Sequence, residues 1–294
     1  MGAVDVDVSI ILVSYNTKDL TRNCLNSIYE FTKDIEFEVF VVDNNSQDGS
    51  AEMIEQEFPQ VRLIKNPENK GFGAANNIAI RLSNAKYVFC LNTDTLLLDN
   101  SIKKFFDYME KKTNVAASGG LLYDKDNNPM GCGGHFPSVK EVFWKLGLKY
   151  ILKKQYKKME PVVYSNEQEL IESIDFITGA DIFFRKKVLD EIGLFDEQFF
   201  MYYEETDLCK RIKNAGYDIK IISNIKIIHL ESKSIKNNVW KNEQCYKSRF
   251  IFFKKHYSKH FFFIKILYSI FFITNTKYRT EEFLPKFFIN MWKL

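Results

Sequence analysis

Short apolar runs alternate with amphipathic stretches along the first part of the chain. The apolar runs have the length of strands and are bounded by turn residues, and they lie near 8–14, 37–43, 61–65, 87–93 and 115–122. The stretches between them have helical periodicity and lie near 18–31, 50–58, 73–84 and 100–112. Because this alternation is typical of βαβ units, it predicts an α/β fold with a mainly parallel sheet flanked by helices.

Three of the predicted strands end in polar side chains, at Ser14-Tyr15-Asn16, Asp43-Asn44-Asn45 and Asn92-Thr93-Asp94. The carboxyl ends of parallel strands meet at one edge of a sheet, and this edge is where α/β proteins bind ligands. A carboxylate that a strand holds in place there can bind a metal ion that bridges a diphosphate. The pattern therefore predicts a ligand site at this edge.

The chain is less regular beyond residue 122. We expect an excursion from the sheet over 123–172, with a flexible segment Gly131-Cys132-Gly133-Gly134 and a lysine-dense helix over 139–158. The strand pattern returns at 174–184. Further elements are expected as helices over 186–192, 205–215 and 239–257, with one or two strands over 220–229.

Composition suits one large domain, or one domain with an appendage. The chain has 294 residues, of which 46% are hydrophobic and 27% charged, with a net charge of only +3. The charge is uneven, because 14 Lys and Arg stand against 4 Asp and Glu from Lys226 onward. Such a basic, aromatic tail can rest on an anionic membrane surface or form a solvated basic face. No nucleic-acid-binding module accompanies the charge, so nucleic acid is not an expected partner.

Two features bear on the compartment. The five cysteines are scattered without CxxC spacing, which favours reduced thiols in a cytoplasmic protein, and no secretory signal pattern opens the chain. The apolar stretch 261–274 is shorter than the ~20 residues that span a bilayer. We expect it to be an interfacial or core-packed helix.

A glycine-punctuated loop, Asn69-Lys-Gly-Phe-Gly-Ala-Ala-Asn-Asn77, precedes a predicted helix. Small residues at a helix start allow a phosphate to approach the backbone, although the same pattern also suits a tight helix entry. The loop lacks both the GxGxxG fingerprint and the GK[ST] ending of a P-loop. An NAD- or FAD-dependent oxidoreductase is therefore disfavoured.

Two further motifs carry candidate chemistry. Tyr202-Tyr-Glu-Glu-Thr-Asp-Leu208 places three carboxylates at a helix start, where they either serve the helix dipole or include a general base for an acceptor hydroxyl. His229 ends an apolar strand and is either a half-buried structural histidine or a metal ligand. Asp43 similarly suits a contact to a ribose or base, or an Asx turn.

Taken in order, these motifs and the segment Thr178-Gly179-Ala180 resemble those of family-2 glycosyltransferases of the rhamnosyltransferase-like branch, over residues 8 to 257. The resemblance implies a GT-A-type fold, in which a Rossmann-like nucleotide half is fused to an acceptor half, and inversion at the anomeric carbon. We assign 8–122 to the first half, 123–257 to the second, and the whole domain to 1–257. Residues 258–294 are then a basic, aromatic C-terminal helical extension in possible contact with a membrane.

The resemblance also implies roles for single residues. Ser14, Tyr15, Asn16 and Asp43 would hold the nucleoside, Asp94 would bind Mn²⁺ or Mg²⁺ on the diphosphate with help from His229, and Gly179 and Ala180 would leave room for the sugars. The remaining donor-binding candidates are Asn45, Asn69, Gly71, Asn76, Asn92 and Thr93.

The motifs depart from the family pattern at two points. Glu205 stands where the acidic pair usually has aspartate, so Asp207 stays a rival to Glu205 as catalytic base, beside Glu204. Asn92 replaces the first aspartate of the metal motif, which makes His229 more important. The implied partners are a nucleotide-sugar donor, first dTDP-rhamnose and next a UDP-hexose or UDP-N-acetylhexosamine, and a glycan or lipid-linked acceptor of bacterial surface polysaccharide. The alternative is a catalytically inactive nucleotide-sugar-binding protein.

Overall fold

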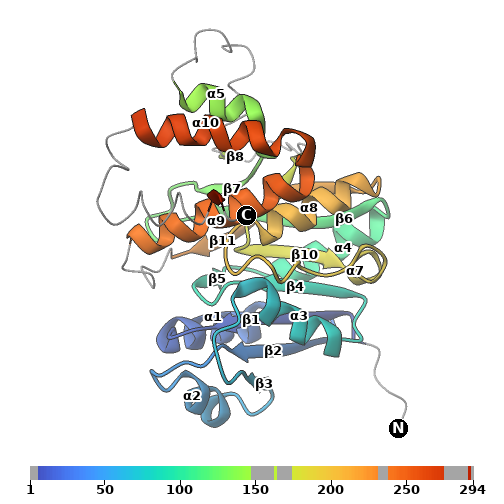
Figure 1. Ribbon diagram of the computed structural model, residues 1–294. Helices are drawn as coiled ribbons and strands as arrows, with labels where there is room; N and C mark the ends of the chain where they lie inside the picture. The colour runs from blue at the N-terminus through green and yellow to red at the C-terminus, as the bar shows by residue number, and fades with distance from the viewer. Residues whose placement is uncertain (1–5, 147–161, 164–173, 231–237, 275–290, 293–294) are drawn as a thin grey trace.

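The computed structural model describes residues 6–146, 162–163, 174–230, 238–274 and 291–292 (Figure 1). Its centre is an eight-stranded sheet, whose strands in spatial order are β3 (Arg62–Lys65), β2 (Phe37–Asp43), β1 (Val8–Ser14), β4 (Tyr87–Leu91), β10 (Asp181–Arg185), β6 (Val115–Tyr123), β11 (Asp218–His229) and β5 (Thr95–Leu97). The strands pair in parallel except at β10 and β5. This confirms the predicted mainly parallel α/β sheet.

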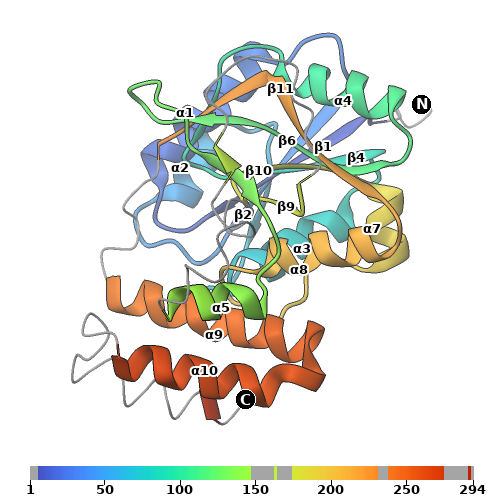
Figure 2. The same ribbon diagram turned by 90° about the horizontal axis from the view of Figure 1, so that it is seen from above.

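Helices cover both faces of the sheet (Figure 2). One face bears α1 (Lys18–Phe31), α2 (Ser50–Glu57) and α4 (Ser101–Lys111). The other bears α3 (Phe72–Leu82), α7 (Lys186–Ile192) and α8 (Glu204–Asn214). The chain progresses outward from β1 to β3 and then returns to β4, so right-handed crossovers put α3 on the opposite face from α1 and α2. The junction of β1 and β4 is therefore the topological switch point, where α/β sheets form their ligand crevice.

The sheet must curl for the chain to connect β4 to β5. These strands occupy the fourth and eighth places in the sheet. Four strand spacings in a flat sheet amount to roughly 19 Å, whereas the four backbone steps from Leu91 to Thr95 reach at most roughly 14 Å. Curling brings the β5 edge back toward the end of β4. The same curl brings His229, which pairs with Thr95 in the β11–β5 ladder, close to the turn that contains Asp94.

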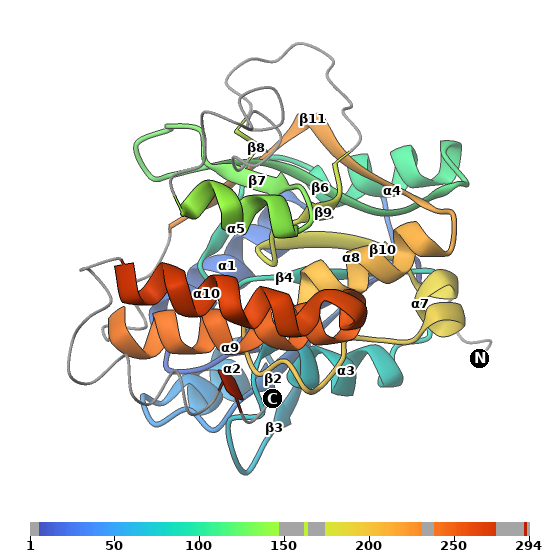
Figure 3. The same ribbon diagram turned by 45° about the horizontal axis from the view of Figure 1, so that its top comes forward.

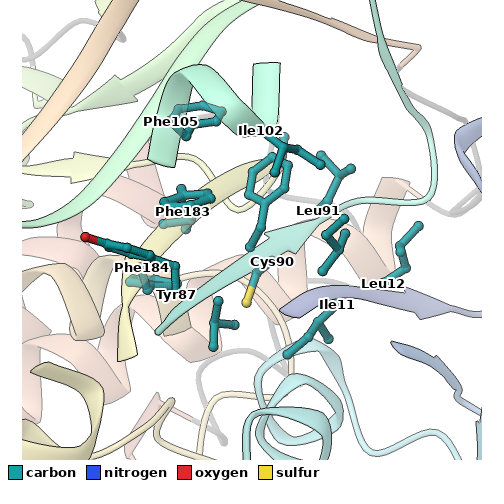
Figure 4. Close-up of a cluster of buried hydrophobic side chains, with 14 of the residues drawn as sticks. Ile11, Leu12, Tyr87, Cys90, Leu91, Ile102, Phe105, Phe183 and Phe184 are labelled. Atoms are coloured by element: carbon teal, nitrogen blue, oxygen red, sulfur yellow. The ribbon is translucent and has the colours of Figure 1, made fainter. Parts of the chain in front are cut away.

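The core lies between the sheet and α4 on one side and α3 on the other. Phe105 of α4 stacks on Phe183 of β10, with ring centroids 5.3 Å apart, while Ile11 and Cys90 point to the opposite face (Figure 4). These side chains are fully buried. This buried core holds the strands in place where they end at the ligand edge.

A smaller sheet corrects one expectation from the sequence. Gly131–Gly134 is not a flexible segment but strand β7, which lies between β8 (Val162–Val163) and β9 (Phe176–Ile177). A Cβ at Gly133 would stand 2.4 Å from the Phe176 carbonyl oxygen. The glycine therefore permits close packing of two strands. Helix α5 (Val139–Lys145) begins where the lysine-dense helix was expected, and most of the remainder to 158 lies outside the described residues.

The C-terminal elements form a separate helical layer. Helix α9 (Asn238–His256), a short 3₁₀ turn (Ser258–His260) and α10 (Phe261–Thr274) follow one another, and α10 packs on α9 and α5 (Figure 3). Their apolar contact includes Val142, Phe250, Tyr268 and Phe272. Within the described residues, no helix has the length and apolar character to cross a bilayer.

Candidate functional site

A cavity opens at the switch point between β1 and β4. Its lining includes six of the residues that the sequence analysis singled out, namely Tyr15, Asn69, Gly71, Asn92, Thr93 and Asp94. They come from the end of β1, the entry to α3 and the turn after β4. The structure thus gathers the predicted polar strand ends at one edge of the sheet. We call this space the donor cavity, after the ligand that the sequence analysis predicts for these residues.

The entry to α3 is held by a network of amide side chains. Asn44 donates from Nδ2 to Asn69 Oδ1 at 3.2 Å and to the Gly71 carbonyl at 3.2 Å, and its own Oδ1 accepts from Asn66 at 2.8 Å. Gly71 has a φ of +83°, and a Cβ there would lie 2.1 Å from the Phe200 carbonyl oxygen. Only glycine fits this position. Asn44 is buried and lines the donor cavity, a role that sequence reasoning did not assign to it.

Asp94 and His229 are partners at the floor of this edge. Their Oδ1 and Nε2 atoms are 3.3 Å apart, and both side chains are mostly buried. The Asp94 carbonyl accepts a hydrogen bond from the Leu230 amide at 2.8 Å, which ties the turn to the end of β11. One carboxylate and one imidazole, held together, are suitable ligands for Mn²⁺ or a similar ion. In the described part of the chain, no cluster of three or more His, Cys, Asp and Glu side chains is arranged for a metal.

The remaining predicted donor residues lie outside the lining of the donor cavity. Asp43 Oδ2 accepts from the Ser46 amide at 3.0 Å, as in an Asx turn, while its Oδ1 is buried without a partner among the described residues. Ser14 contacts the hydroxyls of Thr17 and Thr21. The others in this group are Asn16, Asn45, Asn76, Gly179 and Ala180, of which Asn16 and Asn45 have positive φ in the loops beside the cavity.

A second cavity lies beside the first, and we call it the acceptor cavity after the role that the sequence analysis predicts for Glu205. Its wall includes Glu205, the glycines of β7, Phe176 and the aromatic pair Tyr202 and Tyr203. Met201 lines the donor cavity and Tyr202 the acceptor cavity, so two consecutive residues contribute to the two spaces. Both tyrosines have positive φ, +65° and +70°. Two consecutive non-glycine residues in this conformation mark a strained turn of the kind that occurs at functional sites.

The three acidic residues of α8 have different surroundings. Burial and the neighbouring Glu205 carboxylate hold the pKa of Glu204 well above its ordinary value. Burial also raises the pKa of Glu205, to about 6. Burial alone would raise the pKa of Asp207, but hydrogen bonds from His256 and Lys255 and the charge of Arg211 outweigh it and lower this pKa to about 2. Asp207 is fully buried in these ion pairs and does not line the acceptor cavity.

Helix α9 supplies residues to both cavities that sequence reasoning missed. Trp240 lines the donor cavity and contacts Phe200 edge to face, and Arg249 lines the acceptor cavity. Ser248 donates a hydrogen bond of 2.7 Å to the Met201 carbonyl, which fixes the strained turn. No local pattern marks these positions, because α9 is joined to the site only by the tertiary fold.

Comparison with known proteins places these features in context. Residues 9–193 match the model of the family described as glycosyl transferase family 2. An N-acetylglucosaminyl-diphospho-decaprenol L-rhamnosyltransferase of Mycobacterium tuberculosis is 25% identical over 213 residues, which are 67% of this chain and 67% of that protein. The dTDP-rhamnosyl transferase RfbF of Shigella flexneri is 26% identical over 78% of this chain and 71% of its own.

Solved structures show the same architecture. A mannosyltransferase from Pyrobaculum calidifontis, solved in complex with GDP-Man and Mn²⁺, superposes with a TM-score of 0.59 at 16% identity, over 99% of this chain and 74% of its own. This likeness confirms the expected GT-A-type fold.

Proposed function

Because the chain belongs to glycosyl transferase family 2, we propose that it moves a sugar from a nucleotide-diphosphate donor to a hydroxyl of a glycan or lipid-linked acceptor, with inversion. The observation that carries this proposal is the pair of adjoining cavities. One has the Asp94–His229 pair at its edge and the other has the half-buried Glu205 in its wall. A donor in the first and an acceptor in the second would both lie against the turn that contains Met201 and Tyr202.

The donor we propose first is dTDP-rhamnose, with UDP-hexoses and UDP-N-acetylhexosamines next. The names of the Mycobacterium tuberculosis and Shigella flexneri relatives support a rhamnosyl donor. The lining of the donor cavity agrees, because Met201, Trp240 and Phe72 give it an apolar side that suits the methyl group of a 6-deoxyhexose.

Asp94 and His229 are the residues that would hold a divalent cation. Two protein ligands leave positions for diphosphate oxygens and water, which is how Mg²⁺ and similar ions are usually bound beside substrate phosphates. When bound, such an ion supplies Lewis-acid stabilisation of the leaving diphosphate. Asn92 and Thr93 belong to the same turn as Asp94 and line the donor cavity, so they would contact the donor.

Glu205 is the base in this mechanism. Its carboxylate would remove the acceptor hydroxyl proton as that oxygen attacks the anomeric carbon from the face opposite the departing diphosphate. A pKa of about 6 suits this role, because the group is ionised at neutral pH yet basic enough to accept a proton. Asp207 is unsuited to this role, because its ion pairs lower its pKa to about 2 and it does not line the acceptor cavity.

In the cell, we propose that the enzyme acts in the cytoplasm, at the inner face of the membrane, in synthesis of bacterial surface polysaccharide. The family membership and the relatives named above support this setting. Peripheral membrane contact would come through the extension 258–294.

Glu205→Gln tests the assignment. The amide keeps the shape of the side chain but cannot accept the proton, so kcat should fall by ~10²–10⁴-fold while the donor dissociation constant stays unchanged. Turnover and donor titration on the same preparation would check this. Comparable turnover loss in folded Asp207→Asn, with Glu205→Gln active, would assign the base to Asp207. Donor binding without turnover by the unaltered protein, over many acceptors, would favour an inactive nucleotide-sugar binder.

A further inference from the structure

Helix α10 is apolar on two opposite faces. One face is buried against α5 and α9 through Ile264, Leu267, Tyr268, Phe271 and Phe272. The opposite face exposes a second set of large apolar side chains, which we call the outer face: Phe262, Phe263, Ile266, Ile270 and Ile273. A helix with two apolar faces normally has apolar surroundings on both of them.

The outer face is a continuous stripe. At 100° per residue, positions 262, 266, 270 and 273 fall within a narrow sector of the helix. Phe262 is 68% exposed, and Trp292 lies beside it with ring centroids 6.1 Å apart. Isolated apolar side chains on a surface are ordinary, but a contiguous group of this size indicates an interaction surface. A tryptophan at the rim is typical of contact with a membrane interface.

The charge beside the outer face helps to decide whether a lipid surface or a second copy of the chain would cover it. Residues 244–274 contain six Lys and Arg and no Asp or Glu; Arg249 and Lys255 are ion-paired and Lys265 is buried, so the exposed cations beyond these are Lys247, Lys254 and Lys259. Lys254 and Lys259 are exposed and shortly precede the first residue of α10, Phe261. A second copy of the chain would bring the same positive charges to the contact, whereas an anionic surface would complement them.

We propose that the outer face of α10 rests on the surface of an anionic lipid bilayer, with the helix lying in the plane of the interface. The length of α10, 14 residues, suits this orientation and not a span. This inference rests on the proposed function and deepens it, because a lipid-linked acceptor is held at the same surface.

The docking helix is joined directly to the acceptor cavity. Arg249 of α9, in the wall of that cavity, donates to Tyr268 Oη on the inner face of α10 at 3.0 Å and also to Tyr203 Oη. Glu141 of α5, another wall residue, pairs with the same guanidinium at 3.2 Å. The layer that would contact lipid is therefore the layer that encloses the acceptor.

Vesicle sedimentation of the full chain tests the proposal without any donor or acceptor. We expect binding to phosphatidylglycerol-containing vesicles, weak binding to pure phosphatidylcholine, and a loss of binding as salt is raised. Ile266→Asn/Ile270→Asn should lower the partition coefficient by ~10-fold or more. Lys254→Gln/Lys259→Gln should lower it on anionic vesicles by roughly fivefold for each lysine.

Leu82→Asn/Leu98→Asn is the matched control, because these leucines are similarly exposed on other elements. It should bind vesicles as the unaltered chain does. Failure of the unaltered chain to bind anionic vesicles, or equal binding by the Ile266/Ile270 variant, would overturn the proposal. Light scattering gives a further test. A dimer that does not bind lipid, and that the Ile266/Ile270 variant abolishes, would also overturn the proposal. Transfer to a soluble acceptor is measured separately, so a failed vesicle result leaves the proposed function to its own test.

Discussion

Glu204 is buried and the next residue, Glu205, is half-buried, and each has one buried carboxyl oxygen without a hydrogen-bond partner among the described residues. Two acids this close in a buried site do not readily ionise together. The pKa of Glu204 is raised well above its ordinary value and that of Glu205 to about 6. Of the two carboxyls, Glu205 has the less strongly raised pKa, so it loses its proton more readily and is the available base.

The pH profile of turnover should report this arrangement. We expect kcat/KM to fall tenfold per unit on the acid side of about pH 6, because the protonated form of Glu205 cannot accept the acceptor proton. Initial rates between pH 4.5 and 8, with protein shown to stay folded by circular dichroism, would check it. An acid limb at the ordinary glutamate value, near 4.5, would contradict a buried base.

At the scale of elements, α9 connects parts that are distant in sequence. Its Arg249 contacts three other elements. The guanidinium binds Tyr203 in the turn before α8, Glu141 of α5 and Tyr268 of α10. The Arg249 side chain is only 14% exposed, so the stability of this cluster depends on its charges being paired.

Arg249→Met should destabilise the fold by about 3 kcal/mol, because it removes the guanidinium that binds Glu141, Tyr203 and Tyr268 in a mostly buried cluster. Urea unfolding would measure the loss. The double variant Glu141→Met/Arg249→Met should cost clearly less than the sum of the two single variants, since neither charge is then stranded. Strict additivity in this cycle would show that the two side chains do not interact.

The elements differ in how far the sequence predicts them. The strands over 8–14 and 37–43 have the predicted bounds, because each is an apolar run that ends in a polar turn. β5 and β7 were not predicted, since one has three residues and the other is glycine-rich, and both depend on partners distant in the chain. For the same reason Trp240 and Arg249 could not be assigned to a site, whereas Asp94 and Glu205 could, through the motifs around them.

At the scale of the whole molecule, the donor cavity brings together segments that are far apart in the sequence. The donor cavity draws on β1, β4, the entry to α3 and α9, so a ligand there contacts segments from residue 13 to residue 240. Binding should therefore stabilise the chain as a unit.

A nucleotide sugar at ~100 times its dissociation constant should add roughly 2.7 kcal/mol to the free energy of unfolding. We expect this shift for dTDP-rhamnose before UDP sugars, and a larger shift with Mn²⁺ than with EDTA. A thermal-shift screen would measure it, with Asp94→Asn as the variant in which the Mn²⁺ dependence is lost. Equal shifts with and without Mn²⁺ would argue against a cation at Asp94 and His229.

The short connection from β4 to β5 has a consequence for sequence change. It joins the fourth strand of the sheet to the eighth through Asn92, Thr93 and Asp94 alone, and it forms a tight turn in which the Thr95 amide donates to the Asn92 carbonyl at 3.3 Å. Because the turn is this short, its length sets where β5 lies relative to the end of β4. We expect one inserted residue to open the turn and to move Asp94 away from His229, even if Asn92, Thr93 and Asp94 are all kept. The number of residues between β4 and β5 therefore matters to the site as much as their identity.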